Sequence, residues 1–486
     1  MQIHVPTVAD SVSRLDRTLG DGLEGAIRWQ HRRRLRRVGW QAALDASAGP
    51  WAAHARPPSP GNAIEVHLDG EQALGRIAAA IRSAEHRVFL AGWFFTARFA
   101  LVREPEVVEL RALLAEVAER ADVYVLSWAG APLSLFKPGR HAVHDELEAL
   151  RVHPRIRVAA DRHERPLHCH HEKLVIVDDT HAFVGGIDLT SLGGDRFDRQ
   201  EHAARGALGW HDSAAELRGP AVDVVSEHFR LRWHEVTGER LEAAPPAPAA
   251  GELELQIVRT VPEKIYDELP RGEFTICEAY LGALRSAEQL IYIENQFLWS
   301  SEIVRILVDK LRHPPSDEFR ILLVLPVHPN NGGDDTRGQL GVLAEADGDA
   351  QRALACTVYA GGERPERVYI HSKVTIIDDR WLTIGSANLN EHSLFNDTEM
   401  NVVVSDPETV LATRRRVFAE HLDLPLSEVS GTPHRLIDER WRPIAEEQRA
   451  RLDQHQPLTH RLVSLPGVSR RSRRLLGPIQ SLLVDG

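Results

Sequence analysis

The sequence predicts an α/β protein made of two similar halves, each with a mixed sheet flanked by helices. Strand-like apolar runs alternate with helix-like segments along the chain, which is typical of sheets layered with helices. The 486 residues are enough for two halves that each bury a core. The pattern H-x-K-x-x-x-x-D also occurs twice in one register, 200 residues apart (371 − 171), at His171, Lys173 and Asp178 and again at His371, Lys373 and Asp378.

The first motif leads polar groups into an apolar run. Residues 174–177 are Leu and β-branched residues, which predicts a buried strand, and three histidines and a lysine precede them. A Gly-Gly or Gly-Ser turn follows each motif at the same distance. The duplication extends upstream, because three segments align with counterparts in the second half: 80–95 with 283–298, 123–128 with 321–326, and 157–166 with 357–366. A period this long indicates a duplicated domain, not a solenoid repeat.

These patterns divide the chain into five expected segments. A Pro/Ala-rich stretch suits a semi-extended linker between the halves. The segments are a basic, helical N-terminal extension (1–62), the first half (63–240), the linker (241–252), the second half (253–425) and a helical C-terminal extension (426–486).

Composition narrows the compartment and the partners. The three cysteines have no paired spacing, and neither a secretory signal nor an apolar run of about 18 residues is present. We therefore expect a cytoplasmic protein. The basic segments 27–40 and 461–476 leave peripheral contact with the inner membrane surface open, against the alternative of a helix with solvated arginines. A net charge of −12 argues against a general nucleic-acid binder.

The His and Lys pairs predict an anion site. An ammonium group two residues from a histidine would repel a divalent metal ion, so we expect no metal there. Packing of the halves about a pseudo-two-fold axis would bring both pairs to one cleft. There, two lysines would hold the oxygens of a phosphodiester while one neutral histidine attacks phosphorus and one protonated histidine supplies the leaving group's proton.

Further residues of the two motif regions are candidates for the same site. We expect Asn388 and Asp188, with Ser386 and Gly186 of the glycine turns, to bind the substrate phosphate. Each histidine needs an acceptor for its second ring nitrogen. The candidates are Asp198, 13 residues after Gly185 (198 − 185), and Glu399, 14 residues after Gly385 (399 − 385).

Asp178 and Asp378 end their motifs seven residues after the histidines (178 − 171, 378 − 371). For these two acids a structural hydrogen-bonding role at the strand end is favoured over direct chemistry.

The paired motifs, each followed by G-[GS]-x-[ND], resemble the phospholipase D superfamily over roughly residues 63–420. CHHEK, GGIDL, WHD, IYIENQF and IGSANLNEHS are similar to its phospholipid-cleaving branch. The resemblance implies two α/β halves about a pseudo-two-fold axis, with the active site between them and no cofactor or required metal. It also implies a covalent phosphohistidine that water or an alcohol resolves, with His171 as the nucleophile, His371 as the general acid and Glu399 as an orienting acid. Gly186 and Asp188 depart from the Ser and Asn of many second-type motifs, and the stretch from Gly186 to Asp198 is longer than in many relatives.

Four functions remain open at this point. Hydrolysis or head-group exchange on a glycerophospholipid leads, with water or an alcohol as the acceptor. A cardiolipin synthase-like phosphatidyltransferase would use the same chemistry, although that group usually carries N-terminal membrane helices. A nuclease-type phosphodiesterase is disfavoured by the acidic balance, and a non-catalytic lipid or scaffold protein by the presence of His and Lys in both copies. The loops 130–141 and 328–338 follow matching strands and are expected at the cleft mouth. The sequence predicts no particular oligomeric state.

Overall fold

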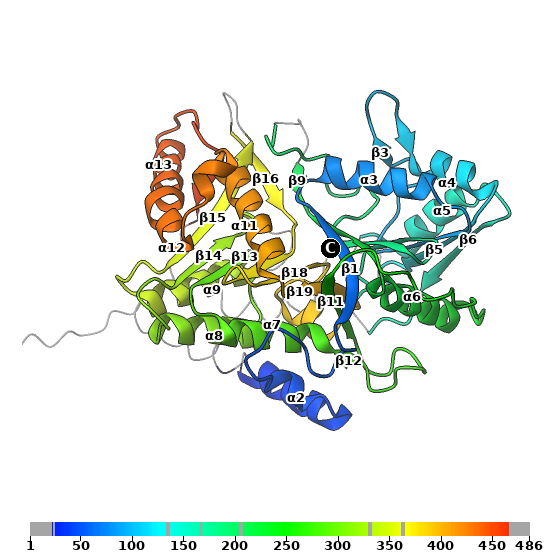
Figure 1. Cartoon of the computed structure of the whole chain (residues 1–486), viewed down its shortest axis with the longest axis horizontal. Helices are drawn as coiled ribbons and strands as arrows, with labels where there is room; N and C mark the ends of the chain where they lie inside the picture. The colour runs from blue at the N-terminus through cyan, green and yellow to red at the C-terminus, as the bar shows by residue number, and fades with distance from the viewer. Residues whose placement is uncertain are drawn as a thin grey trace, which may run out of the picture.

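The structure is a computed structural model that describes residue 22 and residues 25–132, 137–165, 168–203, 208–328, 333–360 and 365–465, without the side chains of 333–335. Most of the basic segment 461–476 and parts of the loops 130–141 and 328–338 lie outside these residues. Two α/β halves lie side by side, as Figure 1 shows in blue to green and in green to orange. The predicted fold class is confirmed.

The first half and its connections contain the following elements, in chain order: α2 (Gln41–Leu44), β1 (Ser59–His67), α3 (Gly70–Arg82), β2 (Arg87–Gly92), β3 (Ala100–Val102), β4 (Val108–Glu109), α4 (Leu110–Ala118), β5 (Asp122–Trp128), α5 (Arg140–Leu150), β6 (Ile156–Asp161), β7 (Leu174–Val177), β8 (His181–Gly185), β9 (Gly209–His211), β10 (Ala214–Arg218) and α6 (Ala221–Thr237). Residues 25–38, which precede α2, are also helical.

The second half repeats the main helices and strands in this order, with short elements of its own, after a stretch without helix or strand at 241–252. Its elements are β11 (Leu253–Val261), β12 (Glu273–Phe274), α7 (Thr275–Ser286), β13 (Leu290–Glu294), α8 (Ser301–Arg312), β14 (Arg320–Val324), α9 (Gly333–Asp347), β15 (Ala353–Ala360), β16 (Glu366–Ile370), β17 (Val374–Ile377), β18 (Trp381–Gly385), α10 (Glu391–Phe395), β19 (Glu399–Val404) and α11 (Pro407–Leu422). The chain continues with η1 (Leu426–Val429), α12 (Pro433–Leu436), η2 (Ile437–Trp441), α13 (Arg442–Asp453) and β20 (Leu462–Ser464).

The strands of both halves follow one order. In the first half it is β6-β5-β2-β7-β8-β10-β1, parallel among the first three strands and antiparallel in the rest. In the second half it is β15-β14-β13-β17-β18-β19-β11, with the same directions. Because β1 also pairs with β11, the two mixed sheets are joined at that edge.

Helices cover both faces of the sheets. Along β2, Val88 and Leu90 pack in a core with α3, α4 and α5, whereas Phe89 points to the opposite face, where α6 lies. The second half repeats this alternation, and Ile291 and its neighbours pack against α7, α8 and α9. One core spans both halves beneath α6, α11 and α13, and so holds them together. The two predicted histidine-led strands, β7 and β17, lie centrally in their sheets.

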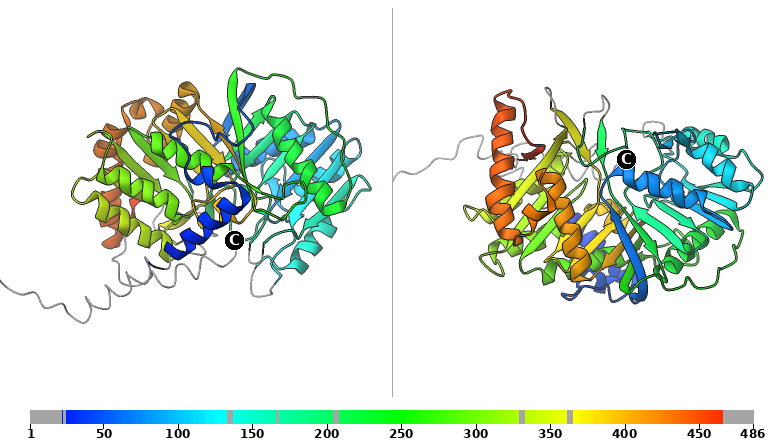
Figure 2. Two further views of the ribbon diagram at one scale, coloured as in Figure 1. Left: turned by 90° about the horizontal axis from the view of Figure 1, so that it is seen from below. Right: turned by 45° about the horizontal axis from the view of Figure 1, so that its top comes forward.

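The basic N-terminal segment forms ion pairs with the second half. Arg28 and Arg32 pair with Glu302, and Arg34 pairs with Glu263. Figure 2 shows this helix and α2 lying against the second half. Trp29 is 61% exposed, so the segment is not fully packed inward. None of the helices in the described part of the chain is both long and apolar enough to cross a bilayer.

Candidate active site

His171 and His371 face each other at the boundary between the halves. Each precedes its strand by three residues, and each is 4% exposed. Their ring centres are 6.5 Å apart, and the rings lie nearly edge to face. The duplication thus brings the two predicted histidines into one site.

Each histidine receives its acid from the other half of the chain. His171 Nδ1 lies 3.0 Å from Glu399 Oε1, and His371 Nδ1 lies 2.6 Å from Asp212 Oδ2. A carboxylate at Nδ1 favours the tautomer with the proton there, which leaves the lone pair on Nε2. Both acids are almost fully buried. Nε2 is therefore the ring nitrogen of each histidine that can attack phosphorus or carry a proton.

Backbone contacts fix the same crossed geometry. The amide N–H of His171 donates to the carbonyl of Thr398 at 2.9 Å, and that of His371 donates to the carbonyl of His211 at 2.8 Å. The hydroxyls of Ser213 and Ser372 are 2.8 Å apart across the boundary. Each histidine is thus held by the segment that carries its acid.

Asp198 does not orient either histidine, which corrects the expectation from spacing. Its carboxylate contacts His202 at 2.7 Å and His211 at 3.2 Å instead. Asp212 takes the position that corresponds to Glu399, because each stands two residues before the residue that pairs with the glycine of its turn. Asp212 lies 27 residues after Gly185 (212 − 185), against 14 for the second half (399 − 385), so extra residues in this loop defeated the spacing argument.

The two lysines lie beside the histidines with different neighbours. Lys173 Nζ donates to the carbonyl of His171 at 2.6 Å and lies 3.1 Å from Asp188 Oδ2. Lys373 donates to the carbonyl of His371 and to Gln296 Oε1, the latter at 3.3 Å.

The two positions that end the glycine turns also differ. Asn388 Nδ2 donates to Gln296 at 3.3 Å, and its Oδ1 is buried without a hydrogen-bond partner among the described residues. Asp188 accepts from the backbone of Trp93 and pairs with Lys173, so it is engaged by protein groups. Sequence reasoning missed Gln296, although it lies in the IYIENQF stretch.

Gly186 and Ser386 differ because their acids differ. A Cβ at Gly186 would lie 2.1 Å from Asp212 Oδ1, so any side chain there would displace the carboxylate that contacts His371. Ser386 instead donates its hydroxyl to Glu399. The predicted turn residues therefore support the orienting acids.

Burial and positive charge set the protonation of the site. Burial, then Lys373 and Lys173, hold the pKa of His371 well below its usual 6.5. Burial raises the pKa of Glu399 well above its usual range and also raises that of Asp212, although lysines oppose both shifts. His371 is therefore neutral while no anion is bound.

A further cation that sequence reasoning missed lies behind His371. Arg196 is 1% exposed, and burial lowers its pKa to about 10. Its guanidinium carbon lies 3.7 Å from the ring centre of Trp210, and that ring is 4.4 Å from the ring of His371. Arg196 thus adds to the positive field at the site.

The two motif aspartates lie at the opposite ends of their strands from the histidines. The carboxylate of Asp178 accepts three backbone N–H groups at residues 85–87, at 2.8–2.9 Å. Asp378 accepts from residues 288–290, each at 2.7 Å. Both residues have positive φ, near 50°, which Asp tolerates in tight turns. Their contacts connect the turn after each strand to the start of the neighbouring strand.

Among the described residues, four groups of His and acidic side chains are close enough to hold a metal ion, and none contains His171 or His371. The donors at the reacting pair are two imidazoles flanked by two lysines, which suits an anion better than a cation. Asp198 belongs to one of these groups and His168 to another.

The chain is similar in sequence to several known proteins. Residues 280–422 match the family described as "Cardiolipin synthase, PLD-like domain". The chain is 26% identical to phospholipase D A of Dictyostelium discoideum over 475 residues, covering 77% of this chain and 36% of that protein. It is 22% identical to phospholipase D alpha 4 of Arabidopsis thaliana, covering 72% and 62%. The chain thus spans only part of the curated relatives that it matches.

A solved structure has the same fold. Phosphatidylserine synthase of Haemophilus influenzae Rd KW20 superposes with a TM-score of 0.54, covering 86% of this chain and 98% of that one. The two sequences are 12% identical, so the likeness concerns the arrangement of helices and strands.

Proposed function

Since the chain belongs to the phospholipase D superfamily, we propose that it is a phosphodiesterase that hydrolyses or transphosphatidylates a glycerophospholipid. The observation that carries the proposal is the facing pair of histidines, each tied at Nδ1 to a buried acid of the other half. Lys173, Lys373 and Asn388 surround the pair with groups that stabilise phosphate oxygens.

The reaction proceeds in two displacements at phosphorus. Nε2 of His171 attacks and forms a P–N bond, while the bond from phosphorus to the head-group oxygen breaks and His371 gives its proton to that oxygen. His371, now neutral, then takes a proton from water or an alcohol, whose oxygen attacks phosphorus. The P–N bond breaks, and His171 and His371 return to their initial states.

Substrate binding supplies the protonation that the first step requires. The neighbouring cations hold the pKa of His371 low in the empty site. A bound phosphodiester carries a negative charge beside those cations, so it raises the pKa of His371. The proton is thus taken up together with the anion, which makes His371 the acid while substrate is bound.

A cardiolipin synthase-like phosphatidyltransferase is the second candidate, favoured by the family match over 280–422. It requires the same first displacement but a lipid alcohol as the acceptor. The choice between the two therefore depends on the second displacement.

The test is to incubate the protein with a panel of phospholipid vesicles, with and without a primary alcohol, and to identify the products by mass spectrometry. Phosphatidic acid alone indicates hydrolysis, a phosphatidyl-alcohol indicates exchange, and cardiolipin from phosphatidylglycerol indicates the second candidate. His371→Ala is the matched inactive control. Cleavage of DNA or bis(p-nitrophenyl) phosphate without cleavage of any phospholipid would overturn the proposal.

A further inference from the structure

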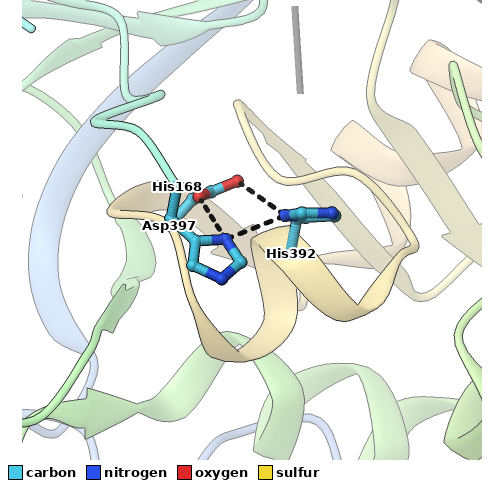
Figure 3. Close-up of side chains that lie close together, drawn as sticks. All are labelled: His168, His392 and Asp397. Carbon is cyan, nitrogen blue, oxygen red and sulfur yellow. Dashed lines mark hydrogen bonds and ion pairs between the residues drawn. The ribbon is translucent and has the colours of Figure 1, made fainter. Parts of the chain in front are cut away.

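Three side chains that the proposed reaction does not use converge next to the active site. Figure 3 shows His168, His392 and Asp397 with their polar atoms directed at one another. His168 Nδ1 lies 2.9 Å from His392 Nδ1 and 3.4 Å from Asp397 Oδ1, and His392 Nδ1 lies 4.0 Å from Asp397 Oδ2. His168 is the first histidine of the stretch that leads into β7.

The cluster is buried and incompletely hydrogen-bonded. Asp397 and His392 are 0% and 1% exposed, and the side chain of His168 is 14% exposed. Asp397 Oδ1 accepts the backbone N–H of Cys169 at 2.9 Å, but Oδ2 has no hydrogen-bond partner in the described part of the chain. A buried carboxylate oxygen without a donor is costly. A cation at this point would satisfy it.

We propose that His168, His392 and Asp397 form a binding site for one divalent transition-metal ion, with zinc the best match. Two imidazole nitrogens and one carboxylate oxygen are ligands that zinc prefers. Bonds of about 2.0–2.1 Å at tetrahedral angles place ligand atoms about 3.3 Å apart. The two imidazole Nδ1 atoms are 2.9 Å apart, and Asp397 Oδ2, the oxygen without a partner, is 4.0 Å from His392 Nδ1, so small side-chain rotations reach this geometry. Water on the exposed side of His168 would complete the coordination.

The surrounding charges permit a cation. The guanidinium groups of Arg34 and Arg165 share the carboxylate of Glu263, at 2.7 and 3.0 Å. Among the described residues neither arginine pairs with Asp397, whose ion-pair contacts are His168 and His392, so its carboxylate can bind an ion. A larger cluster around His211 is less suitable for a metal ion, because its carboxylates and imidazoles already pair with one another at 2.7–3.2 Å. Its members are Asp198, His202, His211, Glu294 and His421.

The ion would link the two halves next to the contact between His171 and Glu399. His168 comes from the first half, three residues before His171, and Asp397 comes from the second half, two residues before Glu399. His171 and Glu399, which follow these two proposed ligands in the chain, contact each other. The site is thus a structural metal site that fixes the junction without taking part in the displacement at phosphorus.

Cobalt titration of the full-length, EDTA-treated protein tests the site, because tetrahedral Co²⁺ with nitrogen and oxygen ligands absorbs visible light. The wild type is expected to bind one Co²⁺ per chain, to lose the absorption when Zn²⁺ is added, and to melt at a higher temperature with Zn²⁺ than without. His168→Gln, which changes the most exposed ligand, is expected to lose at least about 100-fold in affinity and the thermal shift.

Two controls keep the outcome decisive. His313→Gln removes an exposed histidine whose Nδ1 contacts Asp309 at 3.1 Å, a pair with no third ligand among the described residues, and the variant should bind Co²⁺ like the wild type. His202→Gln changes the group Asp198, His202 and His211 and should also retain binding. Absence of a one-to-one Co²⁺ complex in the wild type would overturn the proposal. So would loss of that complex in His202→Gln with retention in His168→Gln.

Discussion

Replacing Asp212 with asparagine tests whether this acid supports the proton donor His371. The carboxylate lies 2.6 Å from Nδ1 in a fully buried setting, where a hydrogen bond to a charged group contributes about 1.5–3 kcal/mol. At about 1.36 kcal/mol per tenfold change in rate, losing it in the transition state lowers kcat about 10- to 150-fold. Asparagine keeps the size of the side chain but cannot stabilise the imidazolium.

The assay compares two leaving groups in mixed micelles. One substrate is the phospholipid that the wild type cleaves fastest, and the other is phosphatidyl-p-nitrophenol, whose leaving group needs no proton. Asp212→Asn should be strongly impaired on the first substrate, whereas its first-turnover release of p-nitrophenol from the second substrate should be close to wild type. Later turnovers still need His371 to accept a proton from water. Glu399→Gln, which alters the support of the nucleophile, should be impaired on both.

Asp198→Asn is the matched control, because it neutralises a buried aspartate 13 residues after Gly185 (198 − 185) that contacts His202 and His211 instead. It should lower thermal stability and leave the rate of the folded protein within a few-fold of wild type. Equal losses for Asp198→Asn and Asp212→Asn, or no leaving-group dependence, would refute the assignment.

Four further outcomes follow from the same geometry. His171→Ala and His371→Ala should each remove nearly all activity, with the double mutant little worse, and half the wild-type rate in either single mutant would contradict a shared site. Gly186→Ala should lower kcat about tenfold or more, because its Cβ would meet Asp212 Oδ1 at 2.1 Å; unchanged kinetics would show that the acid moves freely. Since the pKa of His371 is held below 6.5 and the acid must be protonated, kcat/KM should fall with rising pH through a midpoint below 6.5, and a rise there would contradict its role. EDTA should leave the rate at 25 °C within about twofold, since the proposed metal ion lies outside the reacting pair; a full loss restored by zinc would point to metal in the chemistry.

The fold was predictable because the sequence repeats its own pattern. The buried strand expected at 174–177 is β7 as observed, and its counterpart β17 begins at the matching position. Two copies of one pattern imply two copies of one packing arrangement, and the alternation of core residues along β2 and β13 follows. Local patterns were sufficient here because strands and helices are specified locally.

The partners of the histidines were less predictable because they depend on sheet register across the boundary. Glu399 was found by spacing, whereas Asp212 was missed because the first half inserts a long loop before β10. Gln296 and Arg196 reach the site from a strand end and from that loop, and no periodic pattern marks either residue. Pairings between distant segments appear only when both segments are placed.

The site is complete only when the two halves are packed together, because each histidine contacts an acid of the other half. His171 has its acid in the second half and His371 has its acid in the first, so neither half alone contains a complete His–acid pair.

The burial of the site's titratable groups also lowers the stability of the folded chain. The pKa of His371 is lowered, so below pH 6.5 the unfolded chain binds a proton that the folded chain does not. The free energy of unfolding therefore decreases as the pH decreases below 6.5. The pKa of Glu399 is raised, so above pH 4.5 the unfolded chain releases a proton that the folded chain keeps, and stability falls as pH rises. Between these values both groups destabilise the fold, and the core shared beneath α6, α11 and α13 must offset them. A bound anion offsets the positive charges that lower the pKa of His371. The binding of phosphate and the packing of the two halves therefore favour each other.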